Sequence, residues 1–142
     1  MSKRETVLKA LFKKLSTLEN IPVFRNETLP QKIPKAGIVF LRDGQMSEPE
    51  ILLSPPLFIY QHTAEIEVIV QDVRADMRDT VLDGILTKIN GILSADTTLG
   101  GNVDYMYPKA PEFIEETIEG APTIKAAVIP VVLEYASSTS LT

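Results

Sequence analysis

The chain contains no cysteine and no tryptophan, and it has a single histidine, His62. Without thiols it has no disulfide framework, no thiolate metal site and no cysteine nucleophile. It also lacks a G-x-S-x-G motif or any comparable setting for a nucleophilic serine. We therefore expect His62 to be a structural or surface residue rather than a catalytic base.

Long hydrophobic runs and an excess of positive charge are missing too. The longest apolar run spans only a few residues, far short of the roughly 20 needed to cross a bilayer. The formal charge is −5 and the pI is about 4.9, whereas nucleic-acid binders need clustered cations to neutralise phosphates. We expect neither a membrane partner nor sequence-specific binding to nucleic acid.

What is present is the composition of an ordinary folded protein. The 142 residues are 44% hydrophobic and 23% charged, which is far from the composition of disordered chains. The length suits one domain, and no repeat or low-complexity linker divides the chain. These features predict a single domain over residues 1–142.

The N-terminal segment has the pattern of an amphipathic helix. Ser2 and Glu5 have the spacing of a capping box, in which each side chain accepts a backbone N–H at the helix start. Asn20 and Pro22 are expected to end the helix. The apolar stripe at helical spacing consists of Leu8, Leu11, Phe12, Leu15 and Leu18.

Short β-type segments follow. Val23–Arg25 reads as extended, and Gly37–Arg42 is rich in β-branched and aromatic residues, as strands are. Asp43-Gly44 then predicts a hairpin turn, with a polar loop reaching to Glu50. The strand could resume over Ile51–Leu53, before two prolines interrupt it.

The clearest strand lies between Tyr60 and Asp72. Alternate positions are apolar, with one face towards a core. That face consists of Ala64, Ile66, Val68 and Val70, and the other of Glu65, Glu67, Ile69 and Gln71.

A second helix is predicted over Arg74–Leu93 from its helical period of apolar residues. Asp72 or Asp76 could cap its start. Gly84 and Gly91 weaken the helix intrinsically, and such glycines often mark close approach to a neighbour.

Two strand regions close the chain. Asn102–Tyr107 is extended, with Phe113–Ile118 as an optional further piece, and Thr123–Tyr135 is apolar on both faces. Double-sided apolarity favours a central strand, but Pro130 favours an edge or a bulge. An edge strand covered by a neighbouring subunit would satisfy both, and residues 137–142 read as a frayed tail.

The order of these elements is helix, strands, helix, strands. Consecutive strands within hairpin range favour antiparallel pairing. The sequence therefore predicts an α+β fold, with a mainly antiparallel sheet of about four to five strands and two helices packed on it.

Carboxylates are the remaining candidates for chemistry. Glu65 and Glu67 share one face of a strand, which is a geometry for acid/base work or cation binding. Alternation of polar and apolar residues on a solvated or subunit-facing sheet explains the same pattern, and we favour that interpretation. The acidic run Glu112–Glu119 reads as a solvated loop or edge. We expect no catalytic residue, cofactor or metal.

Charge is distributed unevenly along the chain. Residues 1–14 hold five cations against one carboxylate, a net charge of +4, while the remaining residues carry −9. A basic helix on an acidic body favours head-to-tail contacts between copies. A solvated helix face is the alternative. The cations are Lys3, Arg4, Lys9, Lys13 and Lys14.

The order of several segments resembles the tail terminator family of long-tailed bacteriophages, also called minor tail or tail completion proteins. The resemblance covers nearly the whole chain. It is carried by the opening amphipathic helix, Phe24-Arg25-Asn26 with Leu29-Pro30, residues 37–44 (GIVFLRDG), residues 62–71 (HTAEIEVIVQ), the helix around Arg78, residues 95–101 (ADTTLGG) and the closing strand to Tyr135.

The resemblance implies a non-enzymatic protomer of a ring, in this family a hexamer, at the head-proximal end of the tail tube. Its implied partners are further copies of itself, the tail tube protein and a head–tail connector or neck protein. Its implied location is the virion tail, with assembly in the host cytoplasm. The expected contact residues are Lys3, Arg4, Lys9, Lys13, Asp43, Gly44, Glu48, Glu65 and Glu67.

Two alternatives stay open at this point. One is another connector or neck protein that forms a ring. The other is a small hydrolase or transferase that uses the Glu65 and Glu67 pair.

Overall fold

The computed structural model describes all residues 1–142 and contains two helices and a seven-stranded sheet. The predicted α+β class is confirmed, with more strands than the four or five expected. The elements are α1 (Lys3–Leu15), β1 (Val23–Arg25), β2 (Ile38–Met46), β3 (Glu50–Leu53), β4 (Pro56–Gln71), α2 (Ala75–Ala95), β5 (Tyr105–Pro108), β6 (Glu112–Glu116) and β7 (Ile124–Ser137).

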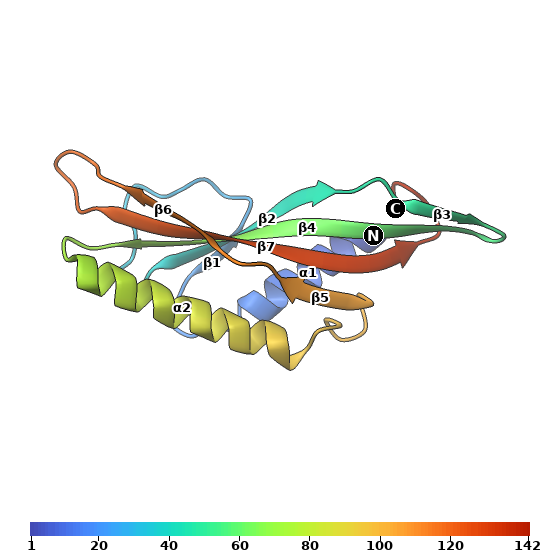
Figure 1. The fold of residues 1–142 in the computed structure, drawn as a ribbon, viewed down its shortest axis with the longest axis horizontal. Helices are drawn as coiled ribbons and strands as arrows, with labels where there is room; N and C mark the ends of the chain where they lie inside the picture. Colours follow the sequence, from blue (N-terminus) through green and yellow to red (C-terminus); the bar gives the residue numbers. More distant parts are fainter.

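The sheet is built around the long strands β4 and β7, which run along the long axis of the molecule (Figure 1). The strand order is β1-β2-β4-β7-β5, with β3 also paired to β4 and β6 also paired to β7. Only β1 and β2 are parallel. β3 and β6 therefore lie on opposite edges of the sheet and, as Figure 1 shows, towards opposite ends of the molecule.

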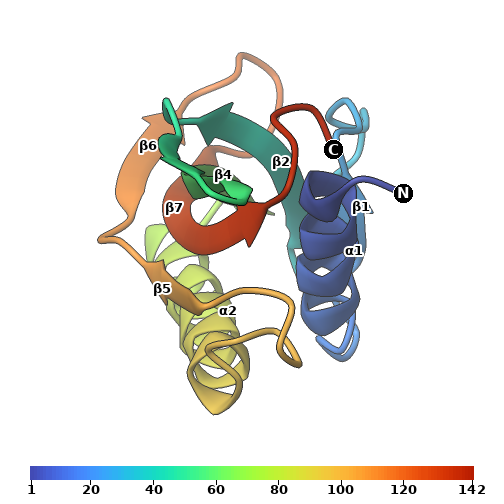
Figure 2. The same cartoon turned by 90° about the vertical axis from the view of Figure 1, so that its right-hand side faces the viewer.

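Both helices pack on the same side of the sheet, which we call the helix side (Figure 2). Each contributes four buried aliphatic residues to one core with β2, β4 and β7. Burial of each such side chain contributes roughly 1.5–3 kcal/mol, so this core holds the helices to the sheet. The helix residues are Val7, Leu8, Leu11 and Leu15 of α1 and Leu82, Ile85, Ile89 and Leu93 of α2.

The other side of the sheet, which we call the open face, carries no helix. At one end, Ile33 from the β1–β2 connection packs with Ile38, Phe40, Ile69 and Ile124. Along β4 the predicted alternation is confirmed: Tyr60 to Val70 are buried at even positions on the helix side, and Glu65 and Glu67 are half-buried between them.

The predicted hairpin at Asp43-Gly44 is wrong. β2 continues through both residues to Met46, and they form a bulge between Arg42 and Gln45. Gly44 has φ of +73°, and a Cβ there would lie 1.9 Å from the Thr63 carbonyl oxygen. Only glycine fits this bulge. The chain reverses later, between β3 and β4.

Pro130 lies in a central strand, so the prediction of a subunit-covered edge strand is wrong. β5 pairs with residues 131–134 of β7 and β6 with residues 124–128, which places Pro130 at the gap between them. Its carbonyl accepts the Lys109 N–H (2.8 Å) on that side. The N–H and C=O of one strand residue point to the same side, so the missing donor faces the gap.

The ends of the first helix and of the chain differ from expectation. Ser2 Oγ accepts the Glu5 N–H (3.0 Å), as predicted, but the Glu5 carboxylate binds Arg25 rather than the Ser2 backbone. α1 ends at Leu15. The tail is not frayed, because Thr142 and Ser140 accept hydrogen bonds from the Lys3 N–H and the Tyr60 hydroxyl.

The second helix also departs from two predictions. No side chain caps α2; Asp72 instead accepts the N–H of Arg74, just before the helix. A Cβ at Gly84 or Gly91 would meet nothing within 4 Å. Within one molecule, these glycines therefore do not mark a close approach.

Candidate interaction surfaces

The open face is strongly acidic. Strand register assigns its side chains, because alternate residues of each strand point to the same side. Among the strand residues on this face, Arg42 is the one cation, against six carboxylates. These are Glu50 of β3, Glu65 and Glu67 of β4, Glu112 and Glu116 of β6 and Glu134 of β7.

Glu65 and Glu67 lie on the same face, as predicted, at the middle of this surface. Arg42 Nε is 3.5 Å from Glu67, and its guanidinium lies over the Phe40 ring, 4.9 Å from the centroid. Arg42 stands opposite Glu65 in the register of β2 and β4. Arg42 is thus paired with Glu67 and stands next to Glu65, an arrangement typical of a polar sheet surface.

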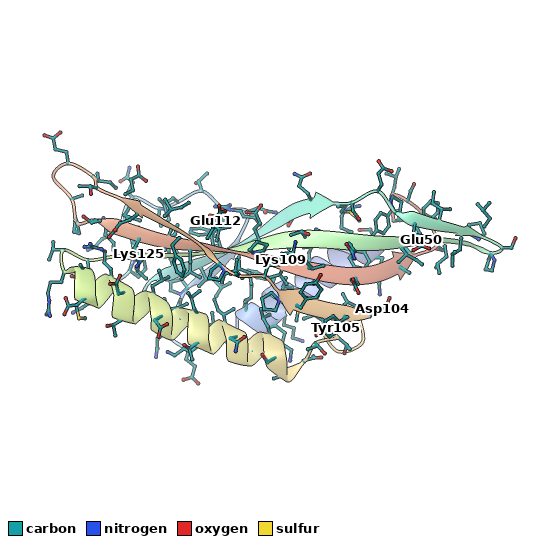
Figure 3. The ribbon with its side chains drawn as sticks, in the orientation of Figure 1. Glu50, Asp104, Tyr105, Lys109, Glu112 and Lys125 are labelled. Atoms are coloured by element: carbon teal, nitrogen blue, oxygen red, sulfur yellow. The ribbon has the colours of Figure 1, made fainter.

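At one end of the open face, four carboxylates surround a groove of about 490 Å³. Glu48, Glu50, Asp104 and Glu134 line it, together with Gln61, and none of the four is in an ion pair. Figure 3 shows Glu50 on β3 and Asp104 just before β5, on either side of the paired strands β4 and β7. Of this set, only Glu48 is among the contact residues predicted from the sequence.

The basic residues of α1 lie on the helix side. Lys9 and Lys13 are exposed and have no ion-pair partner. Arg4 donates to the Leu141 carbonyl (3.3 Å), and Lys14 is 3.4 Å from Asp96. Lys3, Arg4, Lys9 and Lys13 therefore share one helix but are separated from the acidic open face by the sheet.

Asp43 and Gly44 have an internal role. Arg25 makes two hydrogen bonds to Glu5 (2.7 and 2.8 Å) and one to Asp43 (3.0 Å), which ties α1, β1 and β2 together. The hydrogen bonds from Arg25 lower the pKa of Glu5. Burial raises the pKa of Asp43, but hydrogen bonds from Arg25 and Asn26 outweigh it and lower the pKa overall.

His62 is buried on the helix side, only 1% exposed. Its Nε2 is 2.5 Å from the Asp43 carbonyl oxygen and its Nδ1 is 2.8 Å from the Tyr135 hydroxyl. A carbonyl only accepts, so Nε2 carries the proton and Nδ1 accepts from Tyr135. Burial lowers the pKa of His62 and raises that of Tyr135 to about 12. Both ring nitrogens have partners inside the fold, so His62 is a structural rather than a surface histidine.

Two strands carry large exposed apolar side chains. In β3, Ile51, Leu52 and Leu53 are 50, 47 and 78% exposed. In β6, Phe113 and Ile114 are each 55% exposed. Each strand pairs on one edge only, so its outer backbone edge is free. The sequence did not single out these residues, because a local pattern does not tell an exposed apolar strand from a buried one.

A groove of about 550 Å³ separates the C-terminal part of α1 from α2 and includes Lys14, Glu19, Lys88 and Gly91 among its lining. No three histidine and carboxylate side chains are placed to hold a metal ion. Neither helix combines the length and apolarity needed to cross a membrane.

Comparison of the chain with protein-family models and with curated proteins found no match.

Proposed function

We propose that this chain is a structural protein of bacteriophage tail assembly, a protomer of a ring that caps the head-proximal end of the tail tube. The ring ends tube polymerisation and presents a surface to the connector or neck. Two things support the proposal: the resemblance of the sequence to tail terminators, and the position of the exposed apolar strands.

The observation that carries the proposal is that exposed apolar strands lie towards both ends of an elongated protomer. Of the nine residues of β3 and β6, five have large apolar side chains that are exposed. Exposed apolar patches of this kind mark interaction sites. A ring between tube and neck needs a contact surface on each side. β3 and β6 supply one each when the long axis of the protomer runs parallel to the ring axis, from the tube side to the neck side.

Deletion of the gene tests the proposal. The expected result is tubes of uncontrolled length that do not join heads, seen by negative-stain microscopy of lysates. The wild-type gene supplied in trans is the control and should restore uniform tails. Normal-length tails that fail to join heads would indicate a connector or neck protein instead, and normal, infectious particles would rule out both roles.

Variants of the two strands give a sharper test. Leu52→Asp with Leu53→Asp, and Phe113→Asp with Ile114→Asp, place charge at exposed positions, so the fold should survive. Each pair is expected to abolish one contact, to the tube or to the neck, and leave the other intact. Ile118→Asp, at a further exposed apolar residue outside the strands, is the matched control.

A further inference from the structure

The open face and the basic helix are complementary but cannot meet within one molecule. Val7, Leu8 and Leu11 fix α1 to the helix side of the sheet. The carboxylates of the open face point the other way. Lys9 and Lys13 are exposed and form no ion pair within the molecule, so they are available to carboxylates of another copy.

We propose that the open face of one copy binds α1 of a second copy, with Lys9 and Lys13 directed at the carboxylates of the sheet and of the acidic groove. This inference rests on the proposed function and adds the contact that joins neighbours in the ring. Charge complementarity is the reason to place α1 of a second copy on this face. The strands of the open face carry six carboxylates and one cation, Arg42. The first 14 residues carry five cations and one carboxylate, Glu5.

The sign of the charges also fixes the type of contact. Two open faces brought together would oppose carboxylates, and two α1 helices would oppose cations, so symmetric pairing of like surfaces is disfavoured. Pairing of α1 with an open face uses two different surfaces of each molecule. Repetition of such a head-to-tail contact produces a ring when the rotation closes.

The open face also offers apolar contact area. Tyr105 is 48% exposed and lies beside Tyr107, with the ring centroids 5.7 Å apart. Both tyrosines lie on the open face, since they stand opposite Glu134 and Val132 of β7. Aromatic residues often anchor interfaces, and the aliphatic stems of Lys9 and Lys13 can lie on such surfaces while their charges reach carboxylates.

Charge reversal on each side tests the contact. Variant A carries Lys9→Glu and Lys13→Glu, and variant B carries Glu50→Lys and Glu134→Lys. Self-association is measured by sedimentation velocity up to about 1 mM protein. Each variant alone should associate at least about tenfold more weakly than the wild type, because the charge attraction between the two surfaces becomes repulsion. A 1:1 mixture of A and B should regain association, because each α1 then meets an open face of opposite charge.

Matched controls change the same charge at exposed sites elsewhere. Arg74→Glu with Lys88→Glu, and Asp76→Lys with Asp83→Lys, are exposed positions at α2 and should leave association unchanged. Wild-type association should also weaken as salt rises from about 0.05 to 0.5 M, because screening shortens the reach of exposed charges.

The inference is overturned if A and B associate like the wild type, if their mixture regains nothing, or if the wild type is monomeric at every concentration and salt. These outcomes are separate from the gene-deletion result. Loss of tail-length control together with unaffected A and B would leave the proposed function standing without this contact. Normal tails together with rescue in the mixture would leave the contact without the function.

Discussion

His62 is the only imidazole in the chain, and its two nitrogens join the bulge at Asp43 to Tyr135 of β7. Because burial lowers its pKa below the usual 6.5, the unfolded chain binds more protons than the folded chain as the pH falls below that value. The stability from this group is complete above the unfolded pKa and is lost as the pH falls towards the folded pKa.

We therefore expect the free energy of unfolding to fall as the pH drops below the usual histidine pKa of about 6.5, above the titration of most carboxylates. His62→Gln should flatten this dependence, because glutamine does not titrate. It should also lower stability at pH 7 by about 1–3 kcal/mol, since a buried hydrogen-bond partner is lost. Urea unfolding at several pH values measures both effects, and parallel curves for the two proteins would contradict the assignment.

Gly44 shows at the residue scale why a strong local signal was misread. Asp-Gly favours a positive φ, and both a hairpin turn and a bulge use that conformation. What decides between them is distant in sequence: Thr63 and His62 of β4 continue to pair with Gln45 and Met46 beyond the bulge. The dipeptide alone identified the backbone conformation but not the topology.

At the scale of elements, α2 contains two glycines that no neighbour requires. A Cβ at Gly84 or Gly91 meets open space, and alanine is favoured over glycine in a helix by roughly 0.5–1 kcal/mol. Gly84→Ala and Gly91→Ala should each stabilise the protein by about that amount. The two should add, because the sites are about two helical turns apart.

Gly100→Ala is the matched control for these variants. Its site is equally open, but its φ is +67°, so alanine there should destabilise by about 1–2 kcal/mol. Thermal unfolding of the monomer gives all three values. A loss of stability with Gly84→Ala or Gly91→Ala would contradict the open surroundings of these two glycines.

The elements that the sequence predicted well are those with a strong repeating pattern. Alternation located β4, and the apolar stripes located both helices, because these patterns reflect burial on one side of a single element. The sequence of one element does not show which other elements pair with it. Pro130 favoured an edge position, and only the gap between β5 and β6 reconciles it with a central strand.

At the scale of the whole molecule, the predicted contact residues separate into three groups. Asp43 and Gly44 stabilise the fold. Lys3, Arg4, Lys9 and Lys13 lie on α1 on the helix side, whereas Glu48, Glu65 and Glu67 belong to the acidic side. Sequence reasoning found the charge asymmetry but not its arrangement, because the opposition of two surfaces depends on which side of the sheet α1 packs.

The gap at Pro130 has a consequence for motion. It divides the outer edge of β7 into two separate ladders, one with β5 and one with β6. β5 is anchored by Met106, which is 1% exposed, whereas every residue of β6 is exposed, and Arg78–Glu115 is its ion pair to α2.

β6 can therefore detach without unzipping β5, as an independent unit of local unfolding. Amide protons of β6 should exchange with deuterium well before those of β5, as measured by mass spectrometry of peptides. Equal exchange in both strands would show a single cooperative edge. The boundary between the two units lies opposite Pro130, which has no N–H to donate and accepts one hydrogen bond from Lys109.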